Sequence, residues 1–143
     1  MSTDPSAFSG SAPPAPPREA LNRITGIVLD AAIQIHRELG PGLLESVYEA
    51  VLAHELRKRG VHVDTQVPIP VERDGVRLEI GFRADLVADR AVVVEIKSIE
   101  AVAPVHKKVL LTYLRLMDLR VGLFINFGVD VLKDGVTRIV NQF

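Results

Sequence analysis

Two apolar runs separated by one helical segment constrain the fold of this chain more than any other feature. The first, "AVVVEIKS" at 91–98, contains the consecutive β-branched residues typical of a buried strand. The second, "RVGLFINFG" at 120–128, is continuously apolar, as in a strand covered on both faces. Between them, "PVHKKVLLTYLRLMD" at 104–118 has the length and composition of a helix. This order predicts a right-handed crossover that places the two strands parallel.

The preceding elements place this crossover in a mixed sheet. Apolar residues recur at helical spacing over 21–39, stop at "GPG" (40–42) and recur over 44–56. Alternating residues predict strands over 61–69 and 76–84, joined by a hairpin turn at Asp74-Gly75. A short final strand follows "LKDG". We therefore expect an α/β (α+β) fold with a central mixed β-sheet flanked by helices, in the order ααβββαββ.

The N-terminal segment differs in composition from the rest. The stretch "MSTDPSAFSGSAPPAPP" holds most of the prolines and almost no aliphatic side chains, so it cannot bury enough surface to offset chain entropy. We expect a disordered, partly polyproline-II tail over 1–18, which is either a mere extension or a PxxP-type ligand. A single domain over 19–143 follows it.

Charge and cysteine content exclude several functional classes. The 17 Lys and Arg nearly balance the 18 Asp and Glu, so nucleic-acid binding would need a local basic patch or a bound cation. The absence of cysteine excludes disulfides, a thiolate nucleophile and Cys-ligated zinc, and it fits a reducing compartment. No apolar run is long enough to span a bilayer, and the N-terminus lacks a signal-peptide layout. We expect a soluble cytoplasmic protein with no membrane partner.

Glu95 and Lys97 stand two residues apart at the end of the 91–98 strand, so their side chains point to one face. Two interpretations are open. The pair either braces a strand end as an ion pair, or it takes part in chemistry.

Asp85, on the preceding strand, bears on this choice. If the loop between the strands consists only of Asp89 and Arg90, Asp85 points away from Glu95. With an odd-length loop or one bulge, Asp85 stands opposite Glu95, with the two Cβ atoms about 5 Å apart. Such a pair suits a hard divalent cation, which prefers carboxylate and carbonyl oxygens. Lys97 could then orient or deprotonate a water, or stabilise charge on a phosphate.

The residues around this strand resemble a known family. Asp85, nine residues and then "EIK" resembles the Asp…(Asp/Glu)-x-Lys signature of the PD-(D/E)XK nuclease superfamily, with Ala84 in place of the proline that names the motif. "GLLESVY" at 42–48 matches Gly-x-x-Glu-x-x-Tyr, the motif of the GxxExxY family within that superfamily. The likeness runs from about Ile24 to Asn141 through "HRELGPGLLESVYE", "FRADLVAD", "VVVEIKS", "YLRLMDLRVGLFINFG" and "LKDGVTRIV".

The resemblance implies a restriction-endonuclease-like core and a Mg²⁺- or Mn²⁺-dependent enzyme that hydrolyses phosphodiester bonds in DNA or RNA. Asp85, Glu95 and the main-chain carbonyl of Ile96 would be metal ligands, and Lys97 would be the catalytic lysine. Glu45 would be a helical acid that binds a second metal ion or a water on the first.

Without the resemblance, two of these positions have ordinary structural explanations. Glu45 would be an acid placed at the positive N-terminal end of a helix. Tyr48, three residues on and on the same helix face, would be a half-buried ring rather than part of a site.

The helix over 104–118 departs from the family pattern. Family members typically carry a glutamine four residues before a tyrosine; here Tyr113 is present, but position 109 is Val109, which can only pack. Cationic residues on or before this helix, which form either a phosphate-binding patch or a solvated helix face, are His106, Lys107, Lys108 and Arg115. The sequence therefore also fits a nuclease-fold module with weak or no catalysis that binds nucleic acid or a protein partner. A homodimer is one assembly that we consider.

Overall fold

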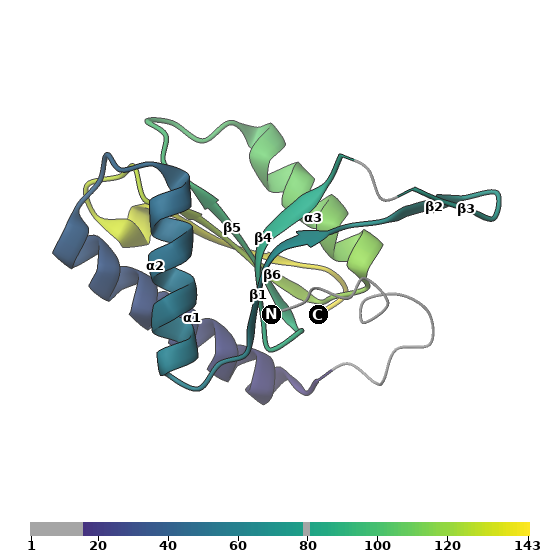
Figure 1. Ribbon diagram of the computed structural model, residues 1–143, viewed down its shortest axis with the longest axis horizontal. Helices are drawn as coiled ribbons and strands as arrows, with labels where there is room; N and C mark the ends of the chain where they lie inside the picture. Colours follow the sequence, from purple (N-terminus) through teal and green to yellow (C-terminus); the bar gives the residue numbers. More distant parts are fainter. Residues whose placement is uncertain (1–15, 79–80) are drawn as a thin grey trace.

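A computed structural model describes residues 16–78 and 81–143 of the chain (Figure 1). The predicted disordered tail therefore lies almost entirely outside the described residues. Arg18, the last residue assigned to that tail, is already the first residue of helix α1.

The two N-terminal helices are separated by a loop that only glycine fits easily. Helix α1 (Arg18–Leu39) ends at Gly40, whose φ of 72° lies in the left-handed region, and whose N–H donates to the carbonyl of His36 at 2.8 Å. Gly42 also has a positive φ, 99°. Helix α2 (Glu45–Lys58) begins directly after this loop. The "GPG" segment thus ends the first helix as predicted.

A five-stranded sheet in the order β1-β4-β5-β6-β7 forms the centre of the fold. Strands β5 and β6 are parallel, and the other neighbours are antiparallel. The crossover through α3 (Pro104–Met117) and the α/β class with a mixed sheet are therefore confirmed. The strands are β1 (Val63–Pro68), β4 (Arg83–Ala88), β5 (Val92–Lys97), β6 (Val121–Asn126) and β7 (Val136–Val140), and a short 3₁₀ helix, η2 (Leu132–Gly135), precedes β7.

The long hairpin predicted over 61–84 is interrupted. Its outer part is a separate two-stranded sheet of β2 (Val71–Arg73) and β3 (Val76–Leu78), closed by Asp74-Gly75 as predicted. Figure 1 shows this hairpin projecting away from the main sheet. Pro68 and Pro70 cannot donate to a strand ladder, which explains why β1 stops there. In the described residues, the two predicted strands correspond to the four strands β1 to β4, and residues 79 and 80 of the predicted 76–84 strand lie outside the described residues.

Two hydrophobic clusters cover the two faces of the main sheet. The first, here called the α1–α2 cluster, packs both N-terminal helices against residues such as Leu86, Val94 and Ile96. The second, the α3 cluster, packs α3 against residues such as Val87 and Val93. Figure 1 shows α1 and α2 together on one side and α3 on the other. Within the described ranges, no helix is long and apolar enough to cross a membrane.

The loop after β6 contacts the segment after β5 so closely that a glycine is required. A Cβ on Gly128 would lie 2.3 Å from the carbonyl oxygen of Ile99 and 2.7 Å from its nitrogen. We expect Gly128→Ala to lower the free energy of unfolding by about 2 kcal/mol or more, measured by chemical denaturation. Gly26→Ala is the matched control, because nothing lies within 4 Å of its added Cβ and alanine favours a helix. Equal stabilities of the two variants would contradict this prediction.

Candidate functional site

The loop between β4 and β5 sets which residues face each other at the end of the hairpin. It has three residues, 89–91, two of which adopt positive φ. The register pairs Leu86 with Val94, so the next residues outward are Asp85 and Glu95. The structure therefore has the odd-length loop, and Asp85 stands beside Glu95 rather than pointing away from it.

Each of these two acids is held by the main chain of the other strand. The Asp85 N–H donates to Glu95 Oε1 at 3.1 Å, and the Ile96 N–H donates to Asp85 Oδ2 at 2.8 Å. Glu95 is only 8% exposed. One oxygen of each carboxylate is thereby fixed in place. Both acids lie next to each other on β4 and β5, just beyond the paired residues Leu86 and Val94.

The charges of the two acids are poorly compensated. The pKa of Glu95 is raised to about 8, mainly by burial and secondly by the nearby charge of Asp85. Burial is also the main cause that raises the pKa of Asp85. The charge of Lys97 lowers both pKa values without cancelling the effect of burial. Glu95 is buried and Asp85 is half-buried, and an added positive charge stabilises the ionised form of two such carboxylates.

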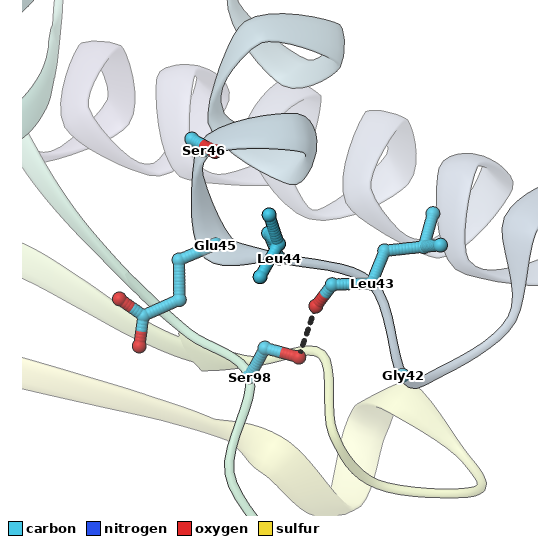
Figure 2. A pocket seen from close by; sticks show the side chains of 6 residues that line it. All are labelled: Gly42, Leu43, Leu44, Glu45, Ser46 and Ser98. Carbon is cyan, nitrogen blue, oxygen red and sulfur yellow. Dashed lines mark hydrogen bonds between the residues drawn. The ribbon is translucent and has the colours of Figure 1, made fainter.

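Glu45 approaches this pair from the first turn of α2. It lines an open pocket of about 560 Å³ together with Ser98 and the residues 42–44 and Ser46. Figure 2 shows Glu45 and Ser98 in this pocket, with the Ser98 hydroxyl donating to the carbonyl of Leu43 at 2.7 Å. That bond ties the segment after β5 to the start of α2. Burial is the main cause that raises the pKa of Asp85, and the negative charge of Glu45 also raises it.

Tyr48 uses its hydroxyl on the loop before α2. It is fully buried, and its hydroxyl donates to the carbonyl of Gly40 and accepts from the N–H of Leu43. Its ring stacks on Phe127 with 4.3 Å between ring centroids. The alternative of a half-buried ring is wrong, because the ring is fully buried in the core. The predicted place of Tyr48 around the site stays a prediction; its hydroxyl braces the loop before α2, which carries Glu45.

On α3, Tyr113 lies near the acids. Burial raises the pKa of its hydroxyl, and the charges of Glu95 and Asp85 raise it further, so the phenol and the carboxylates lie near one another. His106 instead accepts a hydrogen bond from the Ala103 N–H through Nδ1 at 3.1 Å, at the first turn of the helix. The other predicted helix residues, Lys107, Lys108, Val109 and Arg115, are exposed.

Two further residues belong to the neighbourhood of Asp85 and were not predicted. Gln66 of β1 donates through Nε2 to Glu49 Oε1 at 2.6 Å and lies 3.4 Å from Asp85 Oδ1. Glu49 follows Glu45 by four residues on α2, a spacing that places both on one helix face and could have identified it. Nothing in the sequence around Gln66 identifies that residue.

The donor atoms at the site suit a divalent cation held by two acids. In the described part of the chain, no three His, Asp or Glu side chains lie close enough together to hold a metal ion by themselves. Asp85 and Glu95 offer hard oxygen donors, and Mg²⁺ commonly keeps several waters beside one or two carboxylates. The main-chain carbonyl of Ile96 stays a predicted ligand. The raised pKa values of both acids fit such an ion, because its positive charge would stabilise the ionised carboxylates.

Comparison with known proteins agrees with this arrangement. No curated protein and no solved structure matches the chain significantly. A family model described as the PD-(D/E)XK nuclease superfamily matches residues 22–139, which run from α1 to β7 and include Asp85, Glu95 and Lys97. Nucleases of this superfamily generally use divalent metal ions. The chain belongs to the PD-(D/E)XK nuclease superfamily.

Proposed function

We propose that this protein is a Mg²⁺- or Mn²⁺-dependent nuclease of the GxxExxY family that hydrolyses phosphodiester bonds in DNA or RNA. The observation that carries this proposal is the pair Asp85 and Glu95, which stand side by side on β4 and β5. Glu95 is buried, Asp85 is half-buried, and the pKa values of both are raised. A cytoplasmic location and a homodimer stay predictions from the sequence.

Each residue of the proposed site has a distinct part. Asp85, Glu95 and the Ile96 carbonyl would hold the cation, which supplies Lewis acidity for the phosphate and a more acidic attacking water. Lys97 would stabilise negative charge that develops on the phosphate. Glu45 would complete the site from α2, on the side of the open pocket that it lines with Ser98.

Residues of α3 would contact the substrate. Tyr113 lies near the two acids and would donate a hydrogen bond from its hydroxyl to a phosphate oxygen. His106 and Lys108, at the first turns of the helix, would contact backbone phosphates further along the nucleic acid. These contacts would supply the local positive charge that the balanced composition of the whole chain does not provide.

The direct test is metal binding followed by cleavage. We expect calorimetric titration of the wild-type protein with Mn²⁺ to show one binding event at or below millimolar concentration. Supercoiled plasmid and single-stranded substrates should be cut in Mn²⁺ and left intact when a chelator is added. Absence of any binding at millimolar cation would refute the enzyme proposal.

Lys97→Met separates metal binding from chemistry. We expect about a 10²-fold loss of cleavage rate, because the Lys97 cation, whose charge acts on both acids, can no longer stabilise charge or move a proton. Mn²⁺ affinity should stay equal or increase, since a positive charge beside Asp85 and Glu95 is removed. Lys58→Met is the control, with the same change on an exposed side chain of α2. Full activity of Lys97→Met would remove Lys97 from the mechanism.

A second candidate function is a nuclease-fold module that binds nucleic acid or a protein partner with little or no hydrolysis. Val109 favours it: this side chain is 37% exposed and stands one helical turn before Tyr113, the α3 residue beside the acids. An apolar side chain there offers no hydrogen bond to a substrate or a water.

If Val109 limits hydrolysis, Val109→Gln should increase the cleavage rate in Mn²⁺ by about tenfold, the effect expected of one added hydrogen bond of about 1.4 kcal/mol. Val105→Gln is the control, because it places the same amide on an exposed residue one turn earlier on α3. Equal rates for the wild type and Val109→Gln would mean that position 109 is not the limiting feature.

A further inference from the structure

We propose that Gln66 is a positioning residue of this site, which holds the Asp85 side chain in place and links it to Glu49 of helix α2. The inference rests on the proposed function, because it assigns a part to Gln66 only if Asp85 binds a cation.

The backbone of Gln66 is the first observation. Its φ is 50°, a value that is uncommon for a residue other than glycine and that recurs at functional sites. Gln66 lies within strand β1, between Thr65, which pairs with Leu86, and Val67, which pairs with Ala84. The residue opposite Gln66 in this register is therefore Asp85.

Near Gln66, the apolar side chains of both β1 and β4 change from one hydrophobic cluster to the other. On β1, Val63 packs in the α1–α2 cluster, whereas Val67 packs in the α3 cluster. On β4, Leu86 packs in the α1–α2 cluster, whereas Ala84 packs in the α3 cluster. Residues an even number apart on a regular strand share a face, so each strand departs from regular alternation between these positions. Gln66 and Asp85 lie where both strands depart from regular side-chain alternation.

From this position, the Gln66 side chain bridges the carboxylates of Glu49 and Asp85. Its Nε2 group donates to Glu49 Oε1 at 2.6 Å and lies 3.4 Å from Asp85 Oδ1. The other Asp85 oxygen, Oδ2, accepts from the Ile96 N–H at 2.8 Å. Both oxygens of Asp85 thus have a partner that fixes the carboxylate plane, and the neutral amide separates two acids that would otherwise repel each other.

Glycine at position 66 separates the part played by the backbone from the part played by the amide. Gln66→Gly keeps the left-handed conformation without strain and removes the amide. We expect its melting temperature without metal to equal or exceed that of the wild type, while its Mn²⁺ dissociation constant rises about tenfold, in the range found for residues that orient metal ligands. Gln142→Gly is the matched control, because Gln142 also has a positive φ, 53°, and lies at the C-terminus.

A second measurement does not depend on how the glycine variant folds. Glu49→Gln keeps the side-chain length on α2 and removes the charge that Gln66 contacts. In ¹H–¹⁵N spectra of the full chain, we expect the Gln66 side-chain amide signals to shift in Glu49→Gln and again when Mg²⁺ is added to the wild type. The Gln142 amide signals should stay in place in both experiments.

The outcomes separate this inference from the proposed function. The role assigned to Gln66 would be overturned if Gln66→Gly binds Mn²⁺ as tightly as the wild type, or if the Gln66 amide signals do not move. The proposed function would not be affected by either result. If the wild-type protein binds no cation, both proposals fall. Weaker binding by Gln66→Gly with a melting temperature equal to or above that of the wild type supports the positioning role, since loss of a purely structural residue would lower the melting temperature instead.

Discussion

Asp85→Asn is expected to weaken Mn²⁺ binding by about 10²-fold or more and to lower the cleavage rate by about 10³-fold. Changes to residues that only orient metal ligands typically cost 10- to 100-fold in affinity or activity, so removal of a ligand charge should cost at least as much. Loss of electrostatic stabilisation at the phosphate adds to the effect on rate. Calorimetry and a plasmid cleavage assay in Mn²⁺ measure the two quantities.

The substitution keeps the local fold because asparagine retains an oxygen that can accept from the Ile96 N–H, which now donates to Asp85 Oδ2 at 2.8 Å. It also removes the charge that helps to raise the pKa of Glu95, after the larger effect of burial. The metal-free variant should therefore melt no lower than the wild type. Asp74→Asn, at a turn where the side chain is 89% exposed, is the control and should change neither binding nor cleavage. Wild-type affinity in Asp85→Asn would exclude Asp85 as a ligand.

The central part of the fold could be predicted because its signals are local. A continuously apolar strand, a helix and another apolar strand leave few arrangements besides a parallel crossover. The Asp74-Gly75 turn is equally local, since these residue types adopt the positive φ that the turn needs. The end of β1 near Pro68 and Pro70 has a local sign, because proline cannot donate to a strand ladder. The change of face at Gln66 has none, because a glutamine gives no local sign of a left-handed conformation.

The position of Asp85 relative to Glu95 was left open for a related reason. The number of loop residues after β4 determines it, and a long-range contact stabilises the longer loop. Asp89 accepts from the His62 N–H at 2.8 Å through Oδ1, and its own N–H donates to the His62 carbonyl at 2.7 Å. This contact ties the loop to the segment before β1, 27 residues away, and no local pattern reveals it.

Glu95→Gln is expected to stabilise the metal-free protein at alkaline pH. The pKa of Glu95 in the folded state is about 8, above its ordinary value of 4.5, mainly because the group is buried. The folded state therefore binds more protons than the unfolded state between these two values, so the free energy of unfolding of the wild type falls as pH rises through this window. The loss is on the order of a few kcal/mol and ends above pH 8, where Glu95 is charged in both states. Glutamine keeps an oxygen that can accept from the Asp85 N–H and carries no charge, so this contribution to the pH dependence disappears.

Thermal unfolding of the wild type and Glu95→Gln in chelator, from about pH 5 to pH 9, measures this difference. The two melting temperatures should be close at the acidic end and should diverge toward the alkaline end, with the variant higher. Mg²⁺ should raise the melting temperature of the wild type at pH 8 and have little effect on the variant, because a ligand stabilises only the state that binds it. Glu100→Gln, on an exposed side chain after β5, is the control and should follow the wild type. Parallel curves for the wild type and Glu95→Gln would contradict the raised pKa. A pH effect without the Mg²⁺ effect would mean that Glu95 is a buried acid whose charge no cation compensates.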